Sequence, residues 1–266
     1  MCGIGGIINI NNSKIDPEIA NNIKTSLEHR GPDNSSIKHI SETVSLVHTR
    51  LAIIDIEDRS NQPFHSDDNR YWIVFNGEIY NYKQISRDLE KSGARFSSSG
   101  DTEVLLKSWQ LGAEKTLERV DGMFAFAIWD SANERMLLAR DRAGKKPLFW
   151  TTDGSRFAFA SEIKALTGLD WATDDIDADA LPFYLSFGYV PGPKTFYRGI
   201  TALAPAHRMV IEGGRVSEPE RYWELSWGTS PMVAGVDVLA KETRTLLRNA
   251  VERRLVADVP LGAFLS

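Results

Sequence analysis

The stretch that decides the fold reads Met123-Phe124-Ala125-Phe126-Ala127-Ile128-Trp129. In an extended strand, successive side chains point to opposite faces of the sheet. Here the two phenylalanines and the isoleucine share one face, and the two alanines and the tryptophan share the other, so both faces are apolar. A strand of this kind is covered on both sides. We therefore predict an α+β architecture in layers, with helices outside the sheets.

The surrounding sequence predicts further short strands and amphipathic helices. Asp16-Pro17-Glu18 indicates a helix N-terminus, because an aspartate cap is followed by proline at the first helical position. Gly213-Gly214 predicts the turn of a hairpin. Further strands are expected at residues 4–10, 44–48, 51–54, 71–75, 136–139, 148–151, 157–160, 207–211 and 215–217, and helices at residues 19–27, 85–93, 102–111 and 179–187.

Composition and charge exclude several classes of function. The 266 residues are 42% hydrophobic and carry a formal net charge of -5, with the charged residues spread along the chain. This argues against nucleic-acid binding and against a polybasic membrane patch. No stretch approaches the roughly 18 apolar residues that span a bilayer, and the N-terminus does not resemble a secretory signal. We expect a cytoplasmic protein with a small-molecule partner, no nucleic acid and no membrane.

The sequence changes character after residue 217. Residues 226–235 are rich in glycine, serine, threonine and proline, which is typical of a linker. We predict a first domain over residues 2–217, a linker over residues 218–235, and the incomplete start of a second domain over residues 236–266. That start comprises a helix at residues 236–256 and an apolar, strand-like segment at residues 259–266.

The chain contains one cysteine, at position 2. A single cysteine forms no intramolecular disulfide and cannot build a thiol-rich metal site, so we expect no metal. If Met1 is removed, Cys2 carries both a thiol and a free α-amine. The amine has an ordinary pKa of about 7.7 to 8 and the thiol about 8.5, so one residue supplies a base beside its own nucleophile. This arrangement needs no histidine partner.

Six motifs downstream of Cys2-Gly3-Ile4-Gly5-Gly6 cover nearly the whole chain. They are His29-Arg30-Gly31-Pro32-Asp33, His48-Thr49-Arg50-Leu51-Ala52-Ile53-Ile54-Asp55, Phe75-Asn76-Gly77-Glu78-Ile79-Tyr80-Asn81, Ser99-Gly100-Asp101-Thr102-Glu103, Arg140-Asp141-Arg142 with Lys146-Pro147-Leu148, and Ala160-Ser161-Glu162-Ile163-Lys164-Ala165-Leu166. In order and spacing they resemble the glutamine-hydrolysing asparagine synthetases, whose N-terminal domain is a class II glutamine amidotransferase. The resemblance implies a four-layer αββα sandwich, the N-terminal-nucleophile (Ntn) hydrolase fold, followed by the first helix and strand of an α/β ATP-pyrophosphatase-type domain.

The resemblance also implies the catalytic residues. Cys2 would attack the side-chain amide of glutamine, and Asn76 and Gly77 would stabilise the oxyanion that forms; losing one such donor typically costs roughly 100- to 1,000-fold in rate. Glutamate and ammonia would be the products. From local sequence alone, Asn76-Gly77 instead predicts a two-residue hairpin turn.

Further residues would bind glutamine by the same resemblance. The Arg50 guanidinium would bind the α-carboxylate, and Glu78 and Asp101 would bind the α-ammonium. For two of them, local sequence alone favours a role that involves no ligand. Arg50 would be an exposed residue at a strand start, and Asp101 would cap the helix that follows. The backbone of the next residues along the chain would line the pocket: Leu51, Ala52, Ile53 and Ile54.

Hydrolysis of glutamine requires no cofactor. In the complete enzyme, the resemblance implies that ATP and Mg2+ serve the second domain, which converts aspartate and the ammonia into asparagine. Leu265 would abut the adenine, and Ser266 would begin the phosphate loop. A homodimer is possible.

Three alternatives stay open. The first is a relative whose ammonia serves another carboxylate acceptor. The second is another class II amidotransferase, making glucosamine phosphate or phosphoribosylamine, and the third is a non-catalytic glutamine-binding module.

Overall fold

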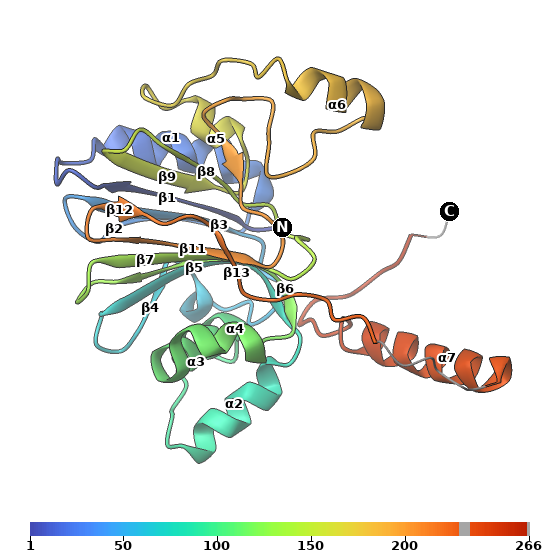
Figure 1. Cartoon of the computed structure of the whole chain (residues 1–266). Helices are drawn as coiled ribbons and strands as arrows, with labels where there is room; N and C mark the ends of the chain where they lie inside the picture. Colours follow the sequence, from blue (N-terminus) through green and yellow to red (C-terminus); the bar gives the residue numbers. More distant parts are fainter. Residues whose placement is uncertain (229–234, 265–266) are drawn as a thin grey trace.

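The apolar stretch at residues 123–129 forms the middle of a sheet. In the computed structural model (Figure 1), which describes residues 1–228 and 235–264, it is strand β6 (Gly122–Asp130). It pairs on one side with β5 (Tyr71–Ile79) and on the other with β7 (Arg135–Arg140). Both faces of β6 are buried, as the sequence predicts.

Two antiparallel sheets make up the fold. One has the strand order β10-β8-β9-β1-β3-β2, and the other has the order β12-β11-β7-β6-β5-β4, with β13 also paired to β11. The bounds of the remaining strands are β1 (Gly3–Asn9), β2 (Asn34–His39), β3 (Val44–Arg50), β4 (Phe64–His65), β8 (Phe149–Thr152), β9 (Arg156–Ala160), β10 (Thr201–Ala202), β11 (His207–Glu212), β12 (Arg215–Val216) and β13 (Glu220–Arg221).

The sheets pack face to face between two layers of helices (Figure 1). The inner faces enclose a core that includes Phe157, Phe159 and Trp129. Helices α1 (Pro17–Leu27) and α5 (Lys164–Thr167) cover the outer face of the first sheet, and α2 (Tyr82–Lys91), α3 (Asp101–Gly112) and α4 (Thr116–Arg119) cover the second. The predicted αββα sandwich is confirmed. Helix α6 (Ala180–Phe187) lies beyond the α1 layer, and α7 (Val236–Glu252) extends away from the sandwich.

Local signals predict several element ends correctly. The Asp16 side chain caps α1 by accepting a hydrogen bond from the Glu18 N–H at 3.0 Å. Gly213 and Gly214 have φ angles of 56° and 76° and form the predicted turn between β11 and β12. Among residues 1–228 and 235–264, no helix combines the length and the apolar character that crossing a bilayer requires.

Two predictions, one after the end of β3 and one in β5, are corrected. Residues 51–54 are not a strand, because the Ala52 N–H donates to Asp33 Oδ2 at 2.8 Å instead of to a neighbouring strand. The hairpin turn at Asn76-Gly77 is wrong, because β5 continues through both residues to Ile79. A Cβ on Gly77 would lie 2.2 Å from the Met123 carbonyl oxygen, so this glycine permits the close approach of β6.

Asp101 does not cap α3. The N-cap is Gly100, and the Asp101 side chain instead accepts a hydrogen bond from the Ile79 N–H of β5 at 2.9 Å. The short polar strand β2, residues 34–39, was not predicted, because its alternating pattern contains a single aliphatic residue.

The region after residue 217 differs in part from the expectation. Two residues of the predicted linker, Glu220 and Arg221, form β13 and pair with β11. The predicted helix is present as α7, although it ends at Glu252. Residues 259–264, the described part of the expected strand, form a loop, since no strand among residues 1–228 and 235–264 pairs with them.

Candidate active site

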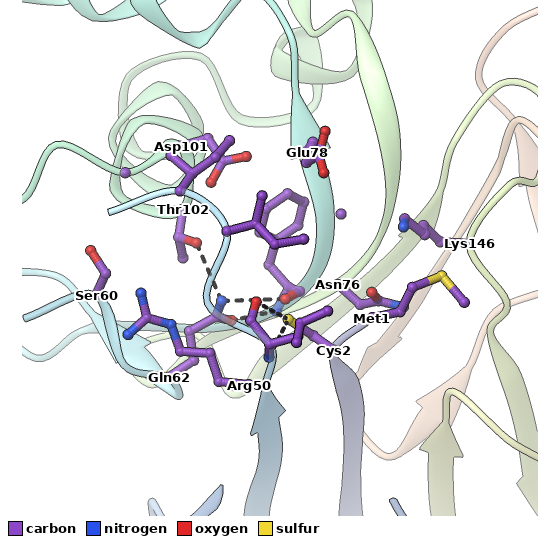
Figure 2. Close-up of a pocket in the computed structure, with 16 residues that line it drawn as sticks. Met1, Cys2, Arg50, Ser60, Gln62, Asn76, Glu78, Asp101, Thr102 and Lys146 are labelled. Atoms are coloured by element: carbon purple, nitrogen blue, oxygen red, sulfur yellow. Dashed lines mark hydrogen bonds between the residues drawn. The ribbon is translucent and has the colours of Figure 1, made fainter. Parts of the chain in front are cut away.

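A pocket lies at one end of the sandwich, where β1 begins and β3 ends (Figure 2). It is lined by every predicted site residue within the described chain except Ala52: Cys2, Arg50, Leu51, Ile53, Ile54, Asn76, Gly77, Glu78 and Asp101. The backbone N–H of Ala52 is engaged by Asp33 as described above. Leu265 lies outside the described residues, so its predicted contact with adenine stays a prediction.

The sheet topology explains why distant residues meet here. Strands β1 and β3 are antiparallel with Gly3 opposite Thr49, which places Cys2 beside Arg50. The end of β5, from the other sheet, contributes Asn76 to Glu78. The hydrogen bond between Ile79 and Asp101 then brings the first turn of α3 to the same place.

The start of β1 is held by hydrogen bonds on both sides of the strand. The Gly3 N–H donates to Thr49 Oγ1 at 3.1 Å, and the Ile4 N–H donates to Ser161 Oγ at 3.0 Å. The Arg30 Nε donates to the Cys2 carbonyl oxygen at 2.9 Å, and Arg30 is paired with Glu162 at 2.7 Å. These contacts fix the position of Cys2. Arg30, Ser161 and Glu162 belong to motifs that gave no role at the sequence level.

The environment of the Cys2 thiol disfavours its ionised form. Burial raises the pKa of the thiol, and the Lys146 ammonium opposes that shift. The sulfur also lies 3.4 Å from the Leu51 N–H. Because a buried thiol is a poor nucleophile, it needs a base within reach. Removal of Met1, which lines the same pocket, would place the α-amine of Cys2 there.

Two hydrogen-bond donors of β5 are available near Cys2. The Asn76 side chain is 1% exposed, and its Nδ2 has no partner among the described residues. Phe75 and Ile79 direct their N–H groups away from β6, to Gln62 Oε1 at 2.6 Å and to Asp101 Oδ2 at 2.9 Å. Because alternate residues of a strand direct their N–H groups to the same side, the Gly77 N–H points that way too.

The partner strand leaves the Gly77 N–H free. In the β5–β6 register Gly77 lies opposite Phe124. Both backbone groups of Phe124 bond to Asp141 instead: its N–H donates to Asp141 Oδ2 at 3.1 Å, and its carbonyl accepts from the Asp141 N–H at 2.8 Å. The β5–β6 ladder therefore places no hydrogen bond on Gly77.

Two carboxyl groups of the pocket, the buried Asp101 and the half-buried Glu78, would favour a positive group on a ligand. Burial, together with the nearby Glu78 charge, raises the pKa of Asp101 to about 7. Burial also raises the pKa of Glu78. A ligand ammonium would relieve the cost of ionising both groups, because an opposite charge favours the charged form of a carboxyl.

Arg50 is buried, not exposed as its local sequence suggests. The side chain is 5% exposed, and Nη1 donates to the Glu57 carbonyl oxygen at 2.9 Å and to Asn61 Oδ1 at 2.7 Å. Nη2 donates to the Asp55 carbonyl oxygen. The loop after β3 thus holds the guanidinium in a fixed orientation beside the pocket.

Lys146 and Gln62 line the pocket and were not recognised as site residues from the sequence. Lys146 is 7% exposed, and burial lowers the pKa of its ammonium. The Asp141 carboxylate fixes the turn that carries it, accepting hydrogen bonds from the N–H groups of Ala143, Lys145 and Lys146. The motif around Arg140 was recognised in the sequence, but no role in the pocket was predicted for Lys146. Gln62, whose amide joins β5 to Thr102 of α3, lies in no recognised motif.

Comparisons with known proteins agree with this site. A family model described as a glutamine amidotransferase domain matches residues 1–223, and the chain belongs to this family. Asparagine synthetase (glutamine-hydrolyzing) 1 of Bacillus subtilis (strain 168) is 35% identical over 269 residues, covering 100% of this chain and 42% of the relative. A putative asparagine synthetase (glutamine-hydrolyzing) 2 of Methanocaldococcus jannaschii is 32% identical, covering 100% of this chain and 54% of the relative.

A solved structure supports the fold. Glutamine phosphoribosylpyrophosphate amidotransferase of B. subtilis superposes with a TM-score of 0.61 at 22% identity, over 84% of this chain and 49% of that one. The predicted Ntn-hydrolase fold and the resemblance to the asparagine synthetase family are confirmed. The chain spans about half the length, or less, of the curated relatives named above.

Proposed function

We propose that the chain hydrolyses glutamine to glutamate and ammonia, with Cys2 as the nucleophile. The observation that carries the proposal is a half-buried thiol that shares one pocket with two donors of β5. Asn76 Nδ2 has no partner in the described chain, and the β5–β6 ladder places no hydrogen bond on the Gly77 N–H. Unsatisfied buried donors cost free energy in the resting protein. Such a cost is expected where the donors stabilise a charge that forms only during reaction.

The rest of the pocket matches a free α-amino acid. The Arg50 guanidinium is a planar donor suited to an α-carboxylate, and its orientation is fixed before substrate arrives. Asp101 and Glu78 would accept hydrogen bonds from the α-ammonium. A ligand held at both charged groups presents its side chain to Cys2.

The chemistry follows from these positions. The α-amine, freed by removal of Met1, takes the proton of the Cys2 thiol, and the sulfur attacks the side-chain carbonyl carbon of glutamine. Asn76 Nδ2 and the Gly77 N–H stabilise the tetrahedral oxyanion. The amine returns the proton to the departing ammonia, and water then hydrolyses the thioester to release glutamate.

We propose further that the complete enzyme uses this ammonia to convert aspartate into asparagine. The names of the curated relatives support this assignment. ATP and Mg2+ would act in the second domain, outside the described pocket. A chain carrying only the pocket described here would release ammonia to solvent.

Glutamate release in the absence of ATP tests the glutaminase. The parent chain and Cys2→Ala are incubated with glutamine, and glutamate is measured enzymatically. We expect release from the parent and none above background from Cys2→Ala. Equal rates from the two proteins would remove Cys2 from the mechanism.

A further inference from the structure

A segment from the far end of the chain contacts the loop that forms the glutamine pocket. The Asp258 N–H donates to the Ile53 carbonyl oxygen at 2.9 Å, and Asp258 Oδ2 accepts a hydrogen bond from the Asp55 N–H at 2.8 Å. One residue therefore bonds to two positions of the loop at residues 51–55. This loop has left the sheet, so its backbone groups depend on such partners.

Asp55, whose N–H donates to Asp258, also helps to orient the Arg50 guanidinium. Asp55 has a left-handed backbone, with φ of 45°, which a residue other than glycine adopts at a cost. Its carbonyl oxygen accepts a hydrogen bond from Arg50 Nη2, while its N–H bonds to Asp258. A shift of the Asp55 backbone would therefore move an acceptor of the Arg50 guanidinium.

The side chain of Asp55 is also held by hydrogen bonds. The Asp55 carboxylate accepts hydrogen bonds from the Ser99 N–H at 2.7 Å and from Arg59 Nε at 3.1 Å. Although burial opposes the shift, these donors lower the pKa of Asp55 to about 2. The side chain is thus anchored within the first domain, and Asp258 supplies the anchor of its backbone N–H.

Neighbouring residues hold the segment against the sandwich. Arg253 Nη1 forms an ion pair with Asp121 at 2.6 Å, and the Arg254 guanidinium lies 4.8 Å from the centre of the Tyr80 ring. Val256 packs against the same apolar cluster as Ile54. Figure 1 shows that α7 leads directly into this segment.

We infer that Asp258 is a positioning residue for glutamine, which holds the loop at residues 51–55 in the form that orients Arg50. The inference rests on the proposed function and deepens it. Because Asp258 follows α7 and not the sandwich, a displacement of α7 loosens the loop and lowers the affinity for glutamine. The chain beyond residue 235 thereby regulates the glutamine pocket.

Steady-state kinetics of Asp258→Ala test this inference. The loop then reaches its binding form in a smaller fraction of molecules, so KM for glutamine rises about tenfold while kcat stays within about twofold. Asp258→Asn keeps an oxygen acceptor and is expected to restore most of the affinity. Asp237→Ala, at the other end of α7, removes the same charge without touching the loop and is the matched control.

The outcomes separate positioning from simple stability. A fall in kcat with unchanged KM, accompanied by a lower unfolding temperature, would overturn the inference, as would equal KM values for Asp258→Ala and Asp237→Ala. Glutamine affinity is also measured by calorimetry in the Cys2→Ala background, where no turnover occurs. If the parent releases no glutamate but calorimetry shows the expected loss of affinity, the proposed reaction fails and the role of Asp258 stands.

Discussion

Replacing Asn76 with leucine should separate stability from catalysis. The side chain is 1% exposed, and its Nδ2 has no partner among the described residues. Leaving such a donor buried costs about 1–3 kcal/mol, and an apolar side chain of similar shape removes that cost. We expect Asn76→Leu to stabilise the protein by about 1 kcal/mol, a rise of about 2–4 °C in Tm for a domain of this size.

The same substitution should nearly abolish turnover. Loss of one oxyanion donor is expected to lower kcat by about 100- to 1,000-fold, equivalent to about 2.7–4 kcal/mol of transition-state stabilisation. KM should change little, because the donor acts on a charge absent from bound glutamine. Glutamate release and thermal unfolding are measured on the same preparations.

Asn9 provides the matched control. It is also a buried asparagine at 5% exposure, but its Nδ2 donates to the Ser13 carbonyl oxygen at 2.9 Å, at the opposite end of β1 from Cys2. Asn9→Leu removes this bond and a second one to Ser13 Oγ, both away from Cys2, and should therefore keep kcat. If Asn76→Leu kept kcat within about tenfold of the parent, the assignment of its amide to the oxyanion would be refuted.

Three further substitutions test the remaining pocket residues. Arg50→Lys should raise KM for glutamine about 10- to 100-fold, because lysine lacks the planar fork; steady-state kinetics with unchanged KM would contradict this. Asp101 has a pKa of about 7 in the folded chain and about 3.9 when unfolded, so its ionisation destabilises the fold progressively between those pH values. Asp101→Asn should therefore exceed the parent in Tm at pH 8 and match it near pH 4, whereas a difference independent of pH would exclude this cause. Lys146→Met removes a charge that lowers the pKa of the Cys2 thiol, so the acidic limb of kcat/KM should move to higher pH, and superimposable pH profiles would argue against the effect.

Parts of the fold that depend on local patterns could be predicted. The doubly apolar sequence of β6 indicates a covered strand without reference to any neighbour, and the Asp16 cap of α1 forms within one turn. That strand also indicated layers with helices outside the sheets, whereas the four-layer αββα order followed from the resemblance to a known family. The short, polar strand β2 was not predicted, because it is determined by its pairing with β3 and not by a hydrophobic pattern of its own.

The Asn76-Gly77 pair shows how tertiary contacts override a local signal. The dipeptide is typical of hairpin turns, yet here it lies within β5. Gly77 is needed because the Met123 carbonyl of β6 approaches it too closely for a side chain. The dipeptide alone cannot distinguish these two uses of glycine.

The candidate site, like the fold, could be predicted only in part. Cys2 could be reasoned from its position and chemistry, whereas the roles of the other site residues came from motifs. Lys146 and Asp258 were missed, because what makes them relevant is a contact with residues far away in the sequence. Local patterns contain no signal for such contacts.

The most direct test of the account is the mass of the N-terminal peptide during turnover. The parent chain is mixed with glutamine, quenched in acid within the steady state, digested and analysed by mass spectrometry. We predict a peptide that begins at Cys2, without Met1, and that carries a glutamyl group on the sulfur in a fraction of the molecules. A fully active chain that retains Met1, or whose first peptide never gains the glutamyl group, would contradict the account.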